Sequence, residues 1–269
     1  MITSEQQLFI NKALPILKRD KRIRGVALEG SYVRKETMDE FSGLDFLLAA
    51  DEADMDSIRR DRVKLAESLG TLLASFPGVH IQRPDLLICL YDEPLMHVDL
   101  NFIALDSLGF RFEDPVVLYE TDGCMTNRFM SSPPVRPIAD MQWFEDRFWI
   151  WVHYAATRIG RGELYDAIGS LDFLRQNVLG PLISMKNGQA PRGVRRLENS
   201  FPNDAVRLSE TVAAYTPKDC LRALKAAANL YISLRGINKA GLFLREDAET
   251  RALKYLSYIE GLLKAKGLA

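Results

Sequence analysis

The residues best suited to chemistry lie in two short stretches of the first half of the chain. In residues 25–48, GVALEGSYVRKETMDEFSGLDFLL, an apolar segment precedes Gly30-Ser31, and a polar loop then leads to Asp45 in a second apolar segment. Asp99 lies in a third such segment, MHVDLNF. Carboxylates are hard oxygen ligands for Mg²⁺, and a Gly-Ser turn offers backbone N–H groups and a hydroxyl to phosphate oxygens. The pattern is typical of a site that handles a metal ion and a phosphate.

Alternation along the predicted strands indicates which side chains share a face. Because strand side chains alternate, Gly43 and Asp45 point to one side, and so do His97, Asp99 and Asn101. The opposite sides are apolar: Leu44, Phe46 and Leu48 in the first segment, and Met96, Val98, Leu100 and Phe102 in the second. The polar faces therefore point to water or to a cleft, and an exposed edge strand would also explain His97, Asp99 and Asn101.

In their order and spacing, these features resemble the signature of the nucleotidyltransferase superfamily that shares the DNA polymerase β palm. In that superfamily a Gly-Ser pair precedes Asp-x-Asp on a strand, and a later strand supplies a third carboxylate. Gly30, Ser31, Asp45 and Asp99 match this pattern, whereas Gly43 stands where the first aspartate is expected. The resemblance implies that Asp45 and Asp99 hold Mg²⁺, that Gly30 and Ser31 cradle phosphate, and that Asp99 doubles as the general base.

The architecture of the whole chain is similar to that of bacterial aminoglycoside and lincosamide nucleotidyltransferases. This resemblance implies transfer of a nucleoside monophosphate, AMP from ATP or another nucleoside triphosphate, to a hydroxyl of a small acceptor such as an antibiotic. The missing carboxylate leaves a second hypothesis open. A catalytically impaired relative would bind a nucleotide or another small molecule without transferring it.

Two acids in the loop before Gly43 are candidates for the missing carboxylate. Asp39 and Glu40 lie three or four residues away, but fixing a loop residue costs roughly 1–2 kcal/mol in backbone entropy. A direct test is to restore the acid. We expect Gly43→Asp to strengthen Mg²⁺-dependent nucleotide binding at little cost in stability, since a strand glycine gains nothing from packing.

Composition is that of an ordinary globular protein of one large or two moderate domains. The 269 residues are 47% hydrophobic and 26% charged, and no apolar run approaches the roughly 20 residues of a membrane span. The N-terminus lacks a secretory pattern, and the three cysteines are scattered, which predicts a cytoplasmic location without disulfides or a membrane partner. A pI near 6.4 disfavours nucleic-acid binding. The oligomeric state is left open.

Charge is distributed unevenly between the two halves. Residues 1–130 carry 15 Lys and Arg against 22 Asp and Glu, whereas residues 131–269 carry 20 against 14. Two solvated surfaces or a charge-complementary contact between the halves would explain the split, and so would a cleft with one acidic and one basic wall.

The first half, residues 1–130, is predicted to be an α+β palm-like domain with a small mixed sheet covered by helices. A capping-box pattern at Ser4-x-x-Gln7 opens a helix that runs to about Asp20, with Leu8 among its apolar positions. A second helix is predicted over residues 53–76, and periodicity fades after residue 106. The predicted strands are 24–29, 44–49, 86–91 and 95–104.

The second half, residues 138–269, is predicted to be an all-α helical bundle after a proline-rich linker at 131–137. Its predicted helices are 140–159, 163–185 with a bend at Gly180-Pro181, 203–214, 217–234 and 247–265. Candidates for an acceptor wall are Glu145, Asp146, Arg147, Trp151, His153 and Tyr154, although aromatics at helical spacing are more typical of a bundle core. The basic turn 191–196 is equally compatible with a phosphate contact and with a solvated loop.

Overall fold

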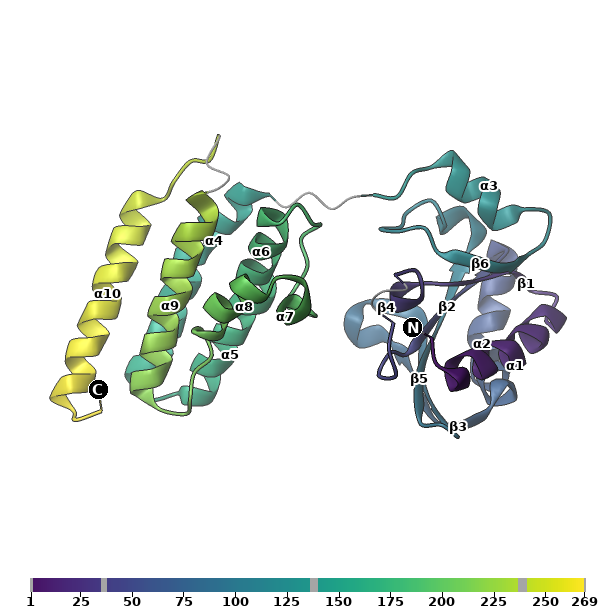
Figure 1. The fold of residues 1–269 in the computed structure, drawn as a ribbon, viewed down its shortest axis with the longest axis horizontal. Helices are drawn as coiled ribbons and strands as arrows, with labels where there is room; N and C mark the ends of the chain where they lie inside the picture. Colours follow the sequence, from purple (N-terminus) through teal and green to yellow (C-terminus); the bar gives the residue numbers. More distant parts are fainter. Residues whose placement is uncertain (1, 35–37, 136–139, 237–240, 269) are drawn as a thin grey trace. The chain divides into compact units, whose positions relative to one another are not determined.

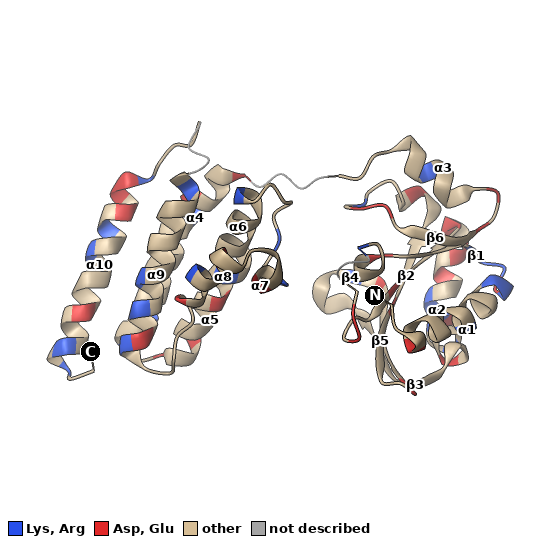
Figure 2. Ribbon diagram, in the orientation of Figure 1, with Lys and Arg blue, Asp and Glu red and all other residues tan. Residues whose placement is uncertain are grey.

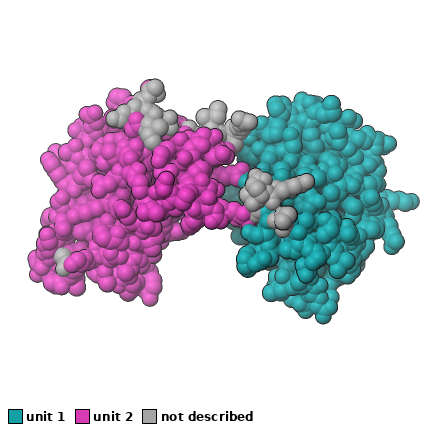
Figure 3. Space-filling view, viewed as in Figure 1, with its two compact units in different colours: residues 1–136 teal, residues 137–269 magenta. Residues whose placement is uncertain are grey.

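The computed structural model describes residues 2–34, 38–135, 140–236 and 241–268. The chain forms two compact units, residues 1–136 and 137–269 (Figures 1 and 3). The boundary falls in the predicted linker, of which residues 136 and 137 lie outside the described part. No helix in the described ranges combines the length and the apolar character needed to cross a lipid bilayer.

Unit 1 is built on a six-stranded mixed sheet in the order β3-β4-β5-β2-β1-β6. β2 and β5 run parallel, and every other neighbouring pair is antiparallel. This central parallel pair carries both predicted carboxylates. The strands are β1 (Ile23–Leu28), β2 (Leu44–Ala50), β3 (Thr71–Gly78), β4 (Arg83–Asp92), β5 (Met96–Ala104) and β6 (Val116–Glu120).

Helices cover the two faces of this sheet unequally. α1 (Ser4–Arg19) and α2 (Glu52–Leu69) pack on one face, where their buried residues join a large core with Phe46, Leu48 and Leu100. On the other face, Met125 of the short helix α3 (Cys124–Ser131) packs on Ala27, Leu47 and Ala49. The second face is therefore only partly covered, and it is the face on which polar strand residues lie.

α1 differs from the predicted helix at its N-cap and at Leu8. Thr3, not Ser4, is the N-cap: its hydroxyl accepts from the backbone N–H of Gln6, whose side chain in turn accepts from the N–H of Thr3. Leu8, one of the apolar positions of the predicted helix, is 68% exposed. The buried positions are Ile10, Ala13 and Leu17, with the i, i+3, i+7 spacing of a single helix face.

The predicted helix over 53–76 was too long. α2 ends at Leu69, Gly70 is extended, and residues 71–78 form β3, which pairs with β4 in an antiparallel hairpin. Leu73, within the strand that replaces the end of the predicted helix, is 51% exposed. The apolar run could not separate helix from strand, because the partner that makes it a strand lies further along the chain. β6 and α3 likewise lie where periodicity had faded.

Unit 2 is a helical bundle, as predicted. Asp140 caps α4 through the N–H of Gln142, and Thr216 caps α9 with Pro217 in its first turn. The predicted helix 163–185 is interrupted by a π-helical segment before Pro181, because proline lacks an N–H and crowds the preceding turn. The helices are α4 (Met141–Arg161), α5 (Leu164–Leu174), α6 (Gly180–Lys186), α7 (Leu197–Ser200), α8 (Pro202–Ser209), α9 (Pro217–Arg235) and α10 (Glu246–Ala265).

Candidate functional site

Asp45 and Asp99 lie side by side on the partly covered face of the unit 1 sheet. They are direct partners in the parallel register of β2 and β5, where strands run about 4.8 Å apart. Their neighbours on the opposite face, Leu44 and Val98, are buried in the core against α1 and α2. The alternation read from the sequence therefore placed both carboxylates on the correct face.

A third acid extends this row by one strand. The backbone N–H of Glu29, at the end of β1, donates to the carbonyl oxygen of Asp45 at 2.9 Å, so Glu29, Asp45 and Asp99 follow one another across three strands. Burial raises the pKa of Glu29, and the negative charge of Asp45 raises it further. The positive charge of Arg83 and a hydrogen bond with Asn101 lower the pKa, but the net shift is upward. The sequence analysis did not single out Glu29, although strand alternation places it on this face.

Gly30 lies directly against the Asp45 carboxylate. Its φ of +63° is in the left-handed region, and a Cβ at this position would lie 2.3 Å from Asp45 Oδ2. Any side chain would therefore be strained and would displace the carboxylate. Ser31 follows in the 3₁₀ turn Gly30–Tyr32. The predicted Gly-Ser turn and the first predicted metal ligand thus form a single local arrangement.

Gly43 is constrained by its neighbour across the sheet. A Cβ there would lie 2.8 Å from the carbonyl oxygen of His97 and 3.5 Å from the His97 Cβ. The backbone of β5 occupies the space that an aspartate would need. The expectation that Gly43→Asp costs little stability was wrong for this reason.

His97 and Asp99 form a hydrogen-bonded pair at this point. His97 Nε2 lies 2.7 Å from Asp99 Oδ1, and this hydrogen bond raises the pKa of His97. The Asp99 side chain is 23% exposed and that of His97 59%. A solvent-accessible imidazole therefore stands beside Gly43, next to the position where the superfamily pattern has its first aspartate.

Asp39, one of the two loop acids considered as a substitute for the missing ligand, is engaged within its own turn. Asp39 Oδ1 accepts hydrogen bonds from the Ser42 hydroxyl at 2.8 Å and from the N–H of Phe41 at 3.1 Å, so this carboxylate stabilises its own turn. Glu40 is exposed. Of the neighbouring loop residues 34–37, only Arg34 is described; it makes a bidentate contact with Glu113 at 2.8 Å for each bond.

The donor set at the sheet fits one Mg²⁺ rather than a fully protein-built metal centre. Among the described residues, no group of three or more His, Cys, Asp or Glu is arranged to hold a metal ion. Asp45 and Asp99 are neighbouring carboxylates, and Mg²⁺ is usually held by one or two carboxylates together with substrate phosphates and water. The residues present therefore fit a metal ion that arrives with a nucleotide.

Two of the candidate acceptor residues in unit 2 have structural roles instead. Glu145 is buried in the bundle and accepts hydrogen bonds from Tyr231 Oη at 2.6 Å and Arg235 Nη1 at 2.9 Å. Asp146 forms an ion pair with Arg245. Among the other members of the predicted wall, Trp151 is half-buried against the bundle core, with its ring centroid 5.0 Å from that of Phe173, and Tyr154 is 53% exposed. The predicted basic turn, residues 191–196, ends at Arg196, the residue directly before α7.

No protein-family model matches this chain, and no curated protein matches it. An aminoglycoside 6-adenyltransferase from Bacillus subtilis is a similar solved structure, with 16% identity and a TM-score of 0.42 over 97% of this chain and 99% of that one. A nucleotidyltransferase-like protein from Exiguobacterium sibiricum 255-15 has 12% identity and a TM-score of 0.39 over 98% and 91%.

Proposed function

We propose that this protein binds a nucleoside triphosphate with Mg²⁺ and transfers the nucleoside monophosphate, AMP from ATP, to a hydroxyl of a small acceptor such as an antibiotic. One observation carries the proposal: Asp45 and Asp99 are register partners, and Gly30 packs against the carboxylate of Asp45. Like charges directly opposite each other destabilise a sheet. A bound cation would offset this cost.

Each residue has a distinct task in the proposed reaction. The acceptor oxygen bonds to the α-phosphorus as the bond to the β-phosphate oxygen breaks, and pyrophosphate leaves. Asp45 and Asp99 would hold Mg²⁺, which when bound neutralises charge on the phosphate oxygens. The Gly30-Ser31 turn presents N–H groups and a hydroxyl to phosphate. Asp99 accepts the proton of the attacking hydroxyl, and His97 orients Asp99 through its hydrogen bond.

Gly43 and His97 favour a second candidate function, nucleotide binding without transfer. A Cβ at residue 43 would crowd the His97 carbonyl oxygen, so the first aspartate of the pattern would strain the sheet, and His97 engages one oxygen of Asp99. Two carboxylates suffice to bind a Mg²⁺–nucleotide complex, but one fewer ligand would weaken the alignment that in-line attack requires. Binding and transfer are therefore measured separately.

The binding experiment is calorimetric titration of ATP into the full chain with and without Mg²⁺. We expect binding that depends on Mg²⁺ and weakens at least tenfold in Asp45→Asn, since tenfold corresponds to about 1.4 kcal/mol. The matched control is Asp122→Asn, because Asp122 is exposed, lies outside the site and has a positive φ that asparagine tolerates. The absence of Mg²⁺-dependent binding would contradict both candidate functions.

The transfer experiment uses ATP labelled at the α-phosphate and a panel of hydroxylated small molecules, aminoglycosides and lincosamides included. Label incorporation that is lost in Asp99→Asn establishes transfer. Mg²⁺-dependent nucleotide binding without incorporation into any acceptor of the panel supports the binding function instead. Incorporation that persists in both Asp45→Asn and Asp99→Asn would show that the chemistry occurs at another site.

A further inference from the structure

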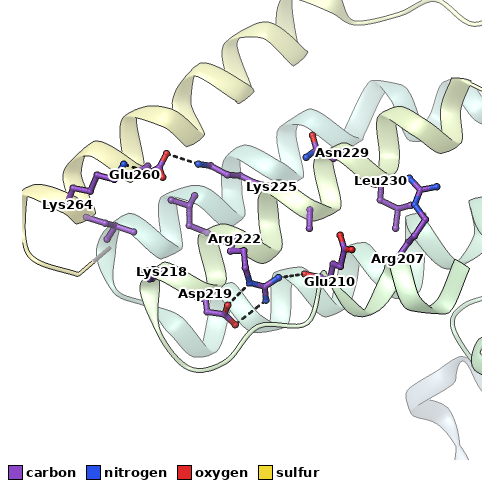
Figure 4. Close-up of a pocket in the computed structure, with 13 residues that line it drawn as sticks. Arg207, Glu210, Lys218, Asp219, Arg222, Lys225, Asn229, Leu230, Glu260 and Lys264 are labelled. Atoms are coloured by element: carbon purple, nitrogen blue, oxygen red, sulfur yellow. Dashed lines mark hydrogen bonds and ion pairs between the residues drawn. The ribbon is translucent and has the colours of Figure 1, made fainter. Parts of the chain in front are cut away.

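A cavity of about 690 Å³ opens between α8, α9 and α10, entirely within unit 2 (Figure 4). Three of its lining residues, Leu221, Leu230 and Leu263, are buried members of the bundle core, and half-buried Ala226 adjoins them. These residues form an apolar floor. Small-molecule sites commonly have volumes of roughly 300–1,000 Å³ and are lined by apolar groups with a few placed polar ones.

The rim of the cavity is predominantly cationic. Lys218, Arg222 and Lys225 recur on α9 at intervals of four and three residues, so they share one face of that helix. Arg207 of α8 and Lys264 of α10 complete a set of five cations, against the three acids Glu210, Asp219 and Glu260. Figure 2 shows the mixed charges along α9 and α10. The lining therefore carries two surplus positive charges.

Ion pairing inside the rim is incomplete. Lys225 Nζ lies 2.7 Å from Glu260 Oε2, and Lys264 Nζ lies 3.5 Å from Oε1 of the same residue, so two ammonium groups share one carboxylate. Lys218 and Arg207 form no ion pair with any residue in the described ranges. A doubly charged anion would match the positive charge that remains.

Arg222 has a different role from the other rim cations. It contacts both oxygens of Asp219 and donates to the carbonyl oxygens of Glu210 and Val212, as the dashed lines in Figure 4 partly show. These bonds tie the loop after α8 to α9. Arg222 therefore stabilises the cavity wall. Lys218 and Lys225 of α9 and Lys264 of α10 have charges that the acids of the rim neutralise only in part.

We propose that this cavity binds a small molecule with an apolar or aromatic body and a phosphate monoester group. The body would lie on the leucine floor, and the phosphate would contact Lys218, Lys225 and Lys264. A phosphate monoester carries about −1.5 to −2 charge at neutral pH, which matches the surplus of two cations better than a single carboxylate would. The site is separate from the residues assigned to nucleotidyl transfer and does not depend on that assignment.

The test is calorimetric titration of the full chain with phenyl phosphate, inorganic phosphate and phenol. Phenyl phosphate should bind at least fivefold more tightly than either fragment, because it alone engages both the floor and the rim. Its affinity should fall as salt rises from low to physiological concentration, since the contacts are near the surface. Equal affinity for phenyl phosphate and inorganic phosphate would overturn the proposal, and so would binding of neither.

Substitutions in the cavity lining test whether phenyl phosphate binds there. The double variant Lys218→Gln/Lys264→Gln should bind phenyl phosphate about tenfold more weakly. The matched control Lys254→Gln, at an exposed position of α10 outside the cavity, should bind it as the parent does. Ala226→Phe should block the floor while keeping every charge. Circular dichroism checks that each variant folds. Full affinity in both cavity variants would refute the assignment.

Discussion

A Cβ atom at Gly43 would lie 2.8 Å from the carbonyl oxygen of His97, closer than real Cβ atoms approach a backbone atom. The contact follows from the pairing of β2 with β5, which places residue 43 opposite residue 97 just before Leu44 meets Val98. A backbone carbonyl in a sheet cannot move aside as a flexible side chain can. The glycine in the motif is therefore required by the sheet in which it lies.

The first prediction concerns that glycine. Gly43→Ala and Gly43→Asp should both lower the free energy of unfolding by about 1–3 kcal/mol, the usual cost of overpacking. Urea denaturation measures this. Gly109→Ala is the matched control in the same unit, because a Cβ there meets only the Ser132 hydroxyl at 3.4 Å. Gly43→Asp should not strengthen Mg²⁺-dependent ATP binding. A stable Gly43→Asp variant that binds more tightly would contradict the steric argument.

The second prediction tests the contact between Gly30 and Asp45. Gly30→Ala should cost more than the roughly 1–2 kcal/mol of left-handed backbone strain, because its Cβ also collides with Asp45 Oδ2. Gly188→Ala is the control: Gly188 has a φ of +71°, and a Cβ added there would meet nothing within 4 Å. We expect Gly30→Ala alone to reduce Mg²⁺-dependent ATP affinity. Equal losses of stability and unchanged ATP binding would show that the carboxylate tolerates displacement.

The third prediction separates charge repulsion from ligand binding at Asp45 and Asp99. Without Mg²⁺, Asp45→Asn should raise the free energy of unfolding by about 0.2–1 kcal/mol, since it removes a like-charge pair on neighbouring strands. With Mg²⁺–ATP at 100 times its dissociation constant, the parent should gain about 2.7 kcal/mol and the variant much less. Thermal and urea unfolding in both conditions give the comparison. A variant that is less stable without Mg²⁺ would indicate that Asp45 serves chiefly in packing.

The fourth prediction is a pH dependence in unit 2. Burial raises the pKa of Glu145, but hydrogen bonds from Tyr231 and the N–H of Arg245, with the charge of Arg235, outweigh it and leave the pKa below 4.5. A carboxylate with a lowered folded-state pKa stabilises the protein above its unfolded-state pKa. That stability is lost as pH falls from about 4.5 through the folded-state value.

The variant Glu145→Gln isolates this contribution. It leaves the Arg235 guanidinium buried with less compensation, and removing one partner of a buried pair costs roughly 3–5 kcal/mol. The loss of stability should be full at pH 7 and should shrink as pH falls below about 4.5, as measured by urea denaturation across pH. Glu260→Gln, at a more exposed and therefore solvent-screened ion pair, should cost much less than Glu145→Gln. A pH-independent effect of Glu145→Gln would show that the carboxylate charge is not what stabilises the bundle.

Local pattern was sufficient to place most of the candidate site. Strand alternation has a period of two and is encoded by neighbouring residues, so the faces of Asp45 and Asp99 could be predicted before the sheet was known. The same holds for the caps at Asp140 and Thr216, because capping depends on residues within one turn. The order of the motif elements also predicted an α+β first half, and apolar residues at helical spacing predicted a helical second half.

Pairing between distant segments decided the rest. Residues 71–78 are a strand because β4 lies beside them, although their apolar pattern continues that of α2. The register of β1, β2 and β5 brings Glu29 into the row of carboxylates and sets His97 against Gly43. Such relationships depend on which backbones hydrogen-bond across the sheet. Residues far apart in the chain determine this strand pairing, so the periodicity of a single segment cannot predict it.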